Sequence, residues 1–178
     1  RQDILHPDLL GYRVYGPDGI LRLGASNIAN RKADISRRED FVFHRDTAHS
    51  GLLVGPAKFG AAAGQWTVSV SRRITNLDGS FGGIVICAIA TKSLSESYGR
   101  LNVGPHGAVS LVHANLELAA RFPELKRSGD PSDTIKVSET LRAAVASGAP
   151  MTQYEYVSGL DSVSRTATVR RIEGQPYF

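Results

Sequence analysis

The clearest candidate ligand contacts lie between residues 66 and 74, where polar and apolar side chains alternate. Thr67, Ser69 and Ser71 fall on one side of an expected strand, and the side chains between them fall on the other. Hydroxyl groups donate and accept hydrogen bonds, so this polar side could hold the polar groups of a small molecule. Trp66 begins the apolar side and is expected to lie in a core.

A helix predicted over residues 37–47 would carry further candidates. Arg38 and His44 are six residues apart, so at about 100° per residue they point to different sides of that helix. Phe41 is three residues from His44 and could form an apolar wall beside it. Lys58 and Phe59 are expected on a later loop that would form the rim of the binding pocket. The candidate ligand-binding residues are Arg38, Phe41, His44, Lys58, Phe59, Thr67, Ser69 and Ser71.

Each candidate also has a purely structural explanation. The hydroxyls could simply be tolerated on a sheet face that a helix half covers. His44 could bond the last carbonyls of its helix. Arg72 and Arg73 could form only surface ion pairs, which contribute about 0–1 kcal/mol.

Catalytic and metal-binding patterns are missing from the sequence. It has no Gly-x-Ser-x-Gly nucleophile elbow and no phosphate-binding loop, because the glycines at 79–83 follow a hairpin turn. Of the five histidines, only His44 and His49 are near each other, and five residues is not a helical ligand spacing. We therefore expect no catalysis in this fragment, no metal and no cofactor.

The composition is that of a globular protein. Among 178 residues, 42% are hydrophobic and 21% charged, which suits one domain or two small ones. The net charge is +4, and the basic pairs are scattered without aromatic residues between them, so we expect no nucleic-acid partner. The single cysteine, Cys87, is expected to be a small buried residue. The sequence has no run of 18 apolar residues, which is about the length that a membrane-spanning helix needs.

A hairpin is predicted at the centre of an antiparallel sheet. Asp78-Gly79 is a turn signal, and the apolar run 84–89 is typical of a strand covered on both faces. Ser36 should cap the helix at 37–47, with Glu39 completing a capping box. A second helix should start at Thr91 or Ser93 and reach residue 101. Further strands of this half are predicted at 12–15, 20–23 and 52–56.

The order of strands and helices then repeats after residue 104. Strands are expected at 108–113, 116–121, 151–157 and 164–172, with a helix from Asp133 or Thr134 to Gly148. That helix would carry Ile135, Val137, Leu141 and Val145. The fold class is therefore α+β, with two stacked modules, 1–103 and a smaller one at 104–178, each an antiparallel sheet flanked by helices.

An ordered set of motifs resembles a known family, the double Cache (PDC-type, PAS-like) extracytoplasmic sensor domains of bacterial transmembrane receptors. The likeness is greatest to domains that precede diguanylate cyclase or histidine kinase domains. Its motifs are YGPDG (15–19), REDF (38–41) with His44, VGP (54–56), GQW (64–66), VSRRI (70–74) with DGSFGG (78–83), ARFP (120–123), and 165–177 with RRI (170–172) and GQP (174–176). The family's long N-terminal helix is mostly missing.

The resemblance implies a periplasmic sensor domain of an inner-membrane receptor. Residues 1–103 would be the membrane-distal, ligand-binding module and 104–178 the membrane-proximal one, and two copies would associate through the missing helix. Amino-acid-binding members carry an aromatic residue and an aspartate on the strand and loop after the helix, and another aspartate near the end of the last distal strand. The residues at those places here are Ala57, Phe59 and Ala88, so both aspartates are absent. A carboxylate or other anion is therefore favoured over an amino acid. The alternatives are a ligand-free structural or dimerisation spacer of the same fold, and a cytosolic PAS-like module that binds a partner.

Overall fold

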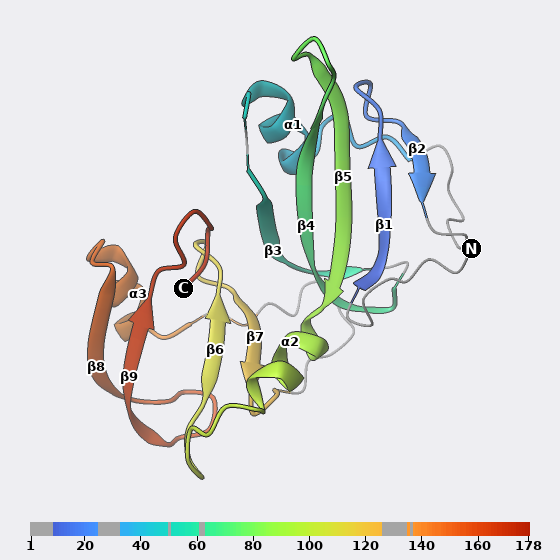
Figure 1. Cartoon of the computed structure of the whole chain (residues 1–178). Coiled ribbons are helices and arrows are strands. Elements are labelled where there is room, and N and C mark those ends of the chain that lie inside the picture. Colours follow the sequence, from blue (N-terminus) through green and yellow to red (C-terminus); the bar gives the residue numbers. More distant parts are fainter. Residues whose placement is uncertain (1–8, 25–32, 50, 61–62, 126–134, 136) are drawn as a thin grey trace. The chain divides into compact units, whose positions relative to one another are not determined.

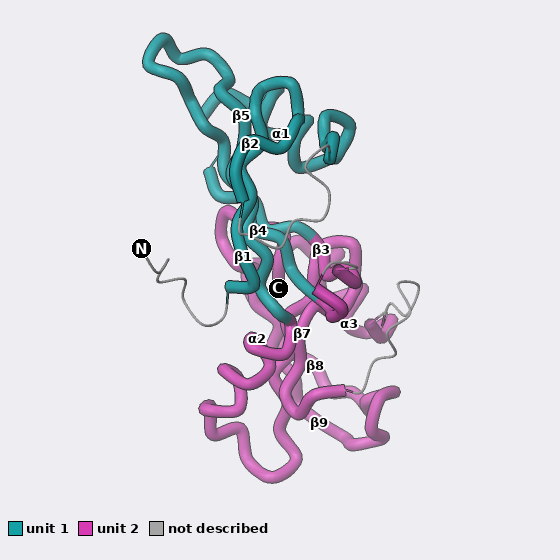
Figure 2. Tube along the Cα trace, turned by 90° about the vertical axis from the view of Figure 1, so that its right-hand side faces the viewer, with its two compact units in different colours: residues 1–55, 67–90 teal, residues 56–66, 91–178 magenta. Residues whose placement is uncertain are grey.

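The computed structural model describes residues 9–24, 33–49, 51–60, 63–125, 135 and 137–178 (Figure 1). Its contacts divide the chain into two compact units (Figure 2). The first comprises residues 1–55 and 67–90, and the second comprises residues 56–66 and 91–178. The expected boundary after residue 103, and the stacking of two modules, stay predictions.

A five-stranded sheet, in the order β2-β1-β5-β4-β3, organises the first unit. β5 pairs antiparallel with both β1 and β4, so the predicted hairpin is confirmed and its second strand is the middle of the sheet. The strands are β1 (Leu9–Tyr15), β2 (Leu21–Gly24), β3 (Leu53–Gly60), β4 (Gln65–Thr75) and β5 (Phe81–Ala90). The last residues of β3 and the first of β4 are counted with the second unit.

The hairpin turn forms as its residues predict. The Asp78 carboxylate accepts hydrogen bonds from the backbone N–H and the hydroxyl of Ser80, at 2.9 and 2.6 Å. Gly79 has φ of +85°, a conformation that glycine adopts without steric penalty. This turn fixes the register in which Ser71 faces Ile86 across the two strands.

Helix α1 (Glu39–Asp46) covers one face of this sheet and closes the core of the first unit. The buried side chains of that core are Tyr15, Ile35, Phe41, Ile84 and Ile86. Phe41 is 1% exposed and meets the ring of Phe81 edge-on, with ring centroids 5.3 Å apart.

The predicted start of this helix is wrong. α1 begins at Glu39, and its N-cap residue, Arg38, makes no side-chain capping bond. The Ser36 N–H instead donates to the Asp34 carboxylate at 2.8 Å, and Arg38 N–H bonds the Ile35 carbonyl. Residues 35–38 therefore form a turn, because the Asp34 side chain offers the backbone a competing partner.

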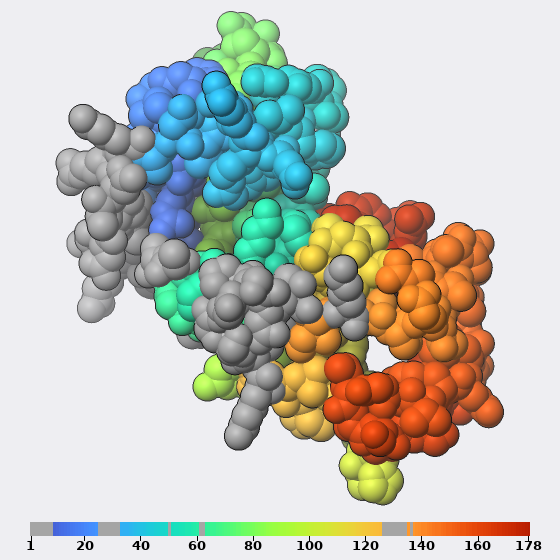
Figure 3. Space-filling model, turned by 180° about the vertical axis from the view of Figure 1, so that it is seen from behind, coloured from blue at the N-terminus to red at the C-terminus, as the bar shows by residue number. Residues whose placement is uncertain are grey.

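The second unit contains two separate two-stranded ribbons, β6-β7 and β8-β9, in place of the one small sheet expected. The space-filling view shows an opening in this unit, bounded by segments coloured yellow to red (Figure 3). Near the C-terminus, Phe178 exchanges backbone hydrogen bonds with Val112 of β6. The elements are α2 (Thr91–Tyr98), β6 (Val109–Val112), β7 (Leu118–Phe122), α3 (Glu139–Ala146), β8 (Met151–Val157) and β9 (Ser164–Arg170).

Helix α3 is shorter than predicted, and two of its four expected apolar residues lie outside it. Ser138 caps the helix by accepting a hydrogen bond from Leu141 N–H at 3.3 Å. The Ile135 carbonyl accepts from Leu118 N–H at 2.8 Å, and Val137 N–H donates to the Leu116 carbonyl at 3.3 Å. Ile135 and Val137 thus bond to backbone at the β7 segment instead of starting a helix. The proposed caps Asp133 and Thr134 lie outside the described residues.

The fold class is α+β, as predicted. Within the described residues, no helix is long and apolar enough to cross a lipid bilayer.

Candidate functional site

The three candidate hydroxyl residues of β4, Thr67, Ser69 and Ser71, lie on the sheet face that α1 covers. Ser71 is paired with Ile86 across β4 and β5, and Ile86 is in the core with Phe41 of α1. Directly paired residues share a face, so Ser69 and Thr67, two and four residues before Ser71, lie on it as well. The alternation in the sequence therefore predicted the correct face.

His44 occupies the covered end of that face. Its side chain is fully buried, and its Nε2 lies 3.0 Å from the hydroxyl of Ser71, which is itself 2% exposed. Burial lowers the pKa of His44 below its usual value. The hydrogen bond with Ser71 and the charge of Asp40 oppose this shift, and the charge of Arg73 adds to it. Arg73 also donates a hydrogen bond to the His44 carbonyl at 2.6 Å. In this structure, His44 covers the Ser71 hydroxyl.

Two other candidates from this segment have structural partners. Phe41 is buried in the core against Phe81. Arg38 turns to Asp40 and forms a two-pronged ion pair, with Nη2 to Oδ2 at 2.6 Å and Nε to Oδ1 at 3.1 Å. Nearly half of the Arg38 side chain remains exposed. The Arg38 guanidinium is thus paired with Asp40, and the Phe41 ring is part of the core.

Beyond Ser71, the same face carries a row of small residues. Gly11, Ala88 and Ser69 follow one another across β1, β5 and β4. Gly55 of β3 continues the row, because a Cβ atom built on it would lie 2.7 Å from the Ser69 hydroxyl. Ser69 and Thr67 are half-buried. Because no side chain in this row is larger than that of serine, little side-chain volume projects from the sheet at this point.

Arg13 is a residue of this face that the sequence reasoning missed. It is paired with Ile86 across β1 and β5, one row from the small residues, and is half-buried. No residue in the described part of the chain forms an ion pair with its guanidinium. Arg13 lies on this face because β1 pairs with β5, and no local sequence motif predicts that pairing.

The remaining two candidates belong to the second unit. Lys58 is exposed. Phe59 is half-buried and meets the ring of Trp66 edge-on, with centroids 6.2 Å apart. The structure therefore brings together Phe41, His44, Thr67, Ser69 and Ser71 on one face, whereas Arg38, Lys58 and Phe59 are engaged elsewhere. The roles of all eight as ligand contacts stay predictions.

Phe59 and Trp66 line a cleft of about 650 Å³ whose wall residues all belong to the second unit. Trp66 is 8% exposed, as expected for a core residue. The sequence reasoning did not find this cleft, because its walls come from segments far apart in the chain. Its lining residues are Phe59, Gly64, Gln65, Trp66, Thr91, Lys92, Ser95, Leu118, Ala119, Ala120, Arg121, Glu124 and Leu125.

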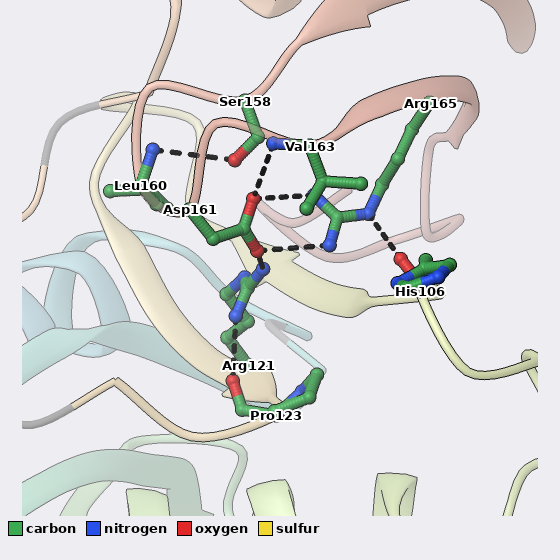
Figure 4. A network of polar contacts seen from close by, with 8 residues as sticks. All are labelled: His106, Arg121, Pro123, Ser158, Leu160, Asp161, Val163 and Arg165. Carbon is green, nitrogen blue, oxygen red and sulfur yellow. Dashed lines mark hydrogen bonds and ion pairs between the residues drawn. The ribbon is translucent and has the colours of Figure 1, made fainter.

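A network of charges lies beside the cleft (Figure 4). The buried Arg121 donates from Nη2 to Asp161 at 2.6 Å and from Nη1 to the Pro123 carbonyl at 2.7 Å. Arg165 binds the same carboxylate through two nitrogens, at 2.7 and 2.9 Å, and donates to the His106 carbonyl. The hydrogen bonds from Arg165 hold the pKa of Asp161 well below its usual range. Both guanidinium groups of the network share this one carboxylate, an arrangement that fixes the positions of the segments that carry them.

No cluster of three or more His, Cys, Asp or Glu side chains suited to a metal ion occurs in the described part of the chain.

Comparison with solved structures places this fold among sensor domains. Over 96% of its length, the chain matches the extracellular domain of rpHK1S-Z16, a protein described as a histidine kinase, with 26% sequence identity and a TM-score of 0.78. The fold is that of bacterial extracellular sensor domains. This confirms the resemblance expected from the motifs.

Chemoreceptor ligand-binding domains share the fold at lower identity. The domain of Campylobacter jejuni Tlp3, in complex with 4-methylisoleucine, matches 89% of the chain with 19% identity and a TM-score of 0.56. The domain of the Pseudomonas aeruginosa amino-acid chemoreceptor PctC, in complex with GABA, matches 93% with 17% identity and a TM-score of 0.57.

The chain spans only part of these sensor domains, namely 68% of the rpHK1S-Z16 domain, 59% of Tlp3 and 69% of PctC. No protein-family model matches the sequence, and a comparison with curated proteins finds no match.

Proposed function

We propose that this chain is the extracytoplasmic ligand-sensing domain of a membrane-bound signal-transduction receptor. The observation that carries the proposal is its likeness to the extracellular domain of a protein described as a histidine kinase, across 96% of the chain. Chemoreceptor ligand-binding domains of the same fold support it. The domain itself is not catalytic, and it regulates a cytoplasmic output such as a diguanylate cyclase or a histidine kinase domain. Residues 1–103 form the membrane-distal module and 104–178 the membrane-proximal one.

The ligand lies on the α1-covered face of the five-stranded sheet, over the row of small residues. The side chains of this row take up little space above the sheet, and the hydroxyls of Ser69, within the row, and Thr67, two residues before it, are on the same face. Arg13 supplies a guanidinium that no described residue neutralises. A half-buried cation on the same sheet face as hydroxyl groups is suited to a carboxylate or another anion.

An amino acid fits this face less well, although Tlp3 and PctC were solved in complex with amino-acid ligands. An α-ammonium group needs a carboxylate partner. The positions where amino-acid-binding members of the family carry an aromatic residue or aspartate hold Ala57, Phe59 and Ala88. The small-residue row itself presents no acid, because its members are two glycines, an alanine and a serine.

A thermal-shift panel of small carboxylates, amino acids, amines and purines tests the proposal. A carboxylate at one hundred times its Kd should stabilise the fold by about 2.7 kcal/mol. At about 2–4 °C per kcal/mol, this raises the unfolding temperature by about 5–11 °C. Arg13→Gln should abolish the shift. Arg72→Gln, at an exposed position one residue from Ser71 and hence on the other face of β4, should leave it intact.

The alternative is a ligand-free spacer of the same fold. The specific observation in its favour is that protein side chains already occupy one end of the face. There, His44 is hydrogen-bonded to the Ser71 hydroxyl and Phe41 packs into the core. A panel in which no compound raises the unfolding temperature would decide for the spacer. A longer piece of the gene should then still dimerise.

A further inference from the structure

The cleft of the second unit has the size of a small-molecule site. Its volume of about 650 Å³ lies within the range of about 300–1,000 Å³ that is typical of ligand pockets. One wall is aromatic, because Phe59 and Trp66 meet edge-on at an interplanar angle of 75°. Leu118 and Ala120 add a buried apolar surface.

Most polar groups of the cleft are already engaged. The Thr91 hydroxyl donates to the Trp66 carbonyl, and the Ser95 hydroxyl donates to the Thr91 carbonyl while accepting from Arg121 N–H. The Arg121 guanidinium is held by the Pro123 carbonyl and Asp161. These groups shape the wall and have little left to offer a ligand.

Among the described residues that line the cleft, the unpaired charge is negative. Glu124 lines it, is exposed, and forms no ion pair with any described residue. Besides Arg121, the described lining carries one cation, Lys92, which lies 3.8 Å from Glu96 on the same helix, so its charge is partly balanced. Glu124 and the two aromatic rings line the same cleft. A carboxylate and aromatic rings in one site can recognise organic cations, through charge attraction and cation–π contact.

We propose that this cleft binds a small organic amine with an apolar body. The ammonium group is held by Glu124, and the body packs on Phe59, Trp66 and Leu118. This site lies outside the face assigned to the sensed anion and takes a ligand of the opposite charge. It therefore stands or falls independently of the proposed function.

Trp66 is the only tryptophan of the chain and lines this cleft, so its fluorescence reports on binding there. The probe is 2-phenylethylamine, compared with 2-phenylethanol and 3-phenylpropionate, which have similar bodies but a neutral and an anionic head. The amine should change Trp66 emission saturably, and the other two should not at the same concentrations.

Two exposed, charge-neutralising variants sharpen the test without disturbing the core. Glu124→Gln should weaken binding of the amine about fivefold, which corresponds to about 1 kcal/mol of charge attraction at a partly exposed site. Lys92→Gln should bind the amine at least as well as the unmodified chain. The proposal is overturned if the amine gives no saturable change, if phenylethanol gives the same change, or if Glu124→Gln binds the amine equally well.

Discussion

Asp161→Asn is the perturbation whose effect the structure defines best, because it removes one charge and keeps the shape of the side chain. The carboxylate of Asp161 accepts two bonds from Arg165 and one from Arg121, and a further one from Val163 N–H at 3.3 Å. Arg121 is only 6% exposed. The amide would leave this buried guanidinium without a counter-charge.

The expected loss follows from that burial. Removing one partner of a buried ion pair destabilises a protein by about 3–5 kcal/mol. The Asp161 side chain is 30% exposed, so water partly replaces it and the lower end, about 3 kcal/mol, applies. At about 2–4 °C per kcal/mol for a chain of this length, the unfolding temperature should fall by about 6–12 °C.

Thermal unfolding at neutral pH measures this loss, and Asp46→Asn is the matched control. Asp46 also forms an ion pair with an arginine, Arg45, but both side chains are about half exposed. Its replacement should leave the unfolding temperature nearly unchanged. If Asp161→Asn lowers the unfolding temperature no more than this control does, the buried Arg121 does not need the Asp161 charge, and the reasoning from burial is refuted.

The same network predicts an acid dependence with a definite sign. Hydrogen bonds from Arg165 lower the pKa of Asp161 in the folded chain. A lowered folded-state pKa contributes stability that is present above the unfolded pKa, about 3.9, and is lost as the pH falls through the folded value. Acid unfolding curves below about pH 4 should therefore be flatter for Asp161→Asn than for the unmodified chain.

Four further outcomes follow from the first unit. Burial lowers the pKa of His44, so its contribution to stability is present above its unfolded pKa of about 6.5 and is lost as the pH falls; His44→Gln should remove this dependence from unfolding curves recorded between pH 5 and 8. Gly55→Ala should destabilise by no more than about 1 kcal/mol in urea unfolding, because its Cβ meets only the Ser69 hydroxyl, which can rotate away, and adding Ser69→Ala should recover the loss. Phe41→Ala should destabilise by about 3–5 kcal/mol in the same assay. Leu77→Ser, at a fully exposed turn position, should stay within about 0.5 kcal/mol of the unmodified chain and serves as the baseline.

Local signals predicted the central hairpin well. Strict alternation assigned the faces of β4, and Asp78-Gly79 placed the turn, because both depend only on residues near each other in sequence. Signals at helix starts were weaker. Ser36 fits a capping pattern, but the Asp34 carboxylate took its N–H, and nothing local decides between these two partners.

The site could be predicted only in part. Alternation put Ser69 and Ser71 on one face, but it could not show that His44, 27 residues before Ser71, covers that hydroxyl. Arg13 joins the same face only through the pairing of β1 with β5. The cleft of the second unit was out of reach for the same reason, because Trp66 and Glu124 come from distant segments.

Titration of the isotope-labelled domain with a stabilising carboxylate, followed by amide resonances, tests the central claim of ligand sensing most directly. If the domain senses an anion on the α1-covered face, the largest shifts should fall on Gly11, Ser69 and Ala88. Shifts confined to the second unit, or the absence of any carboxylate that binds, would contradict it.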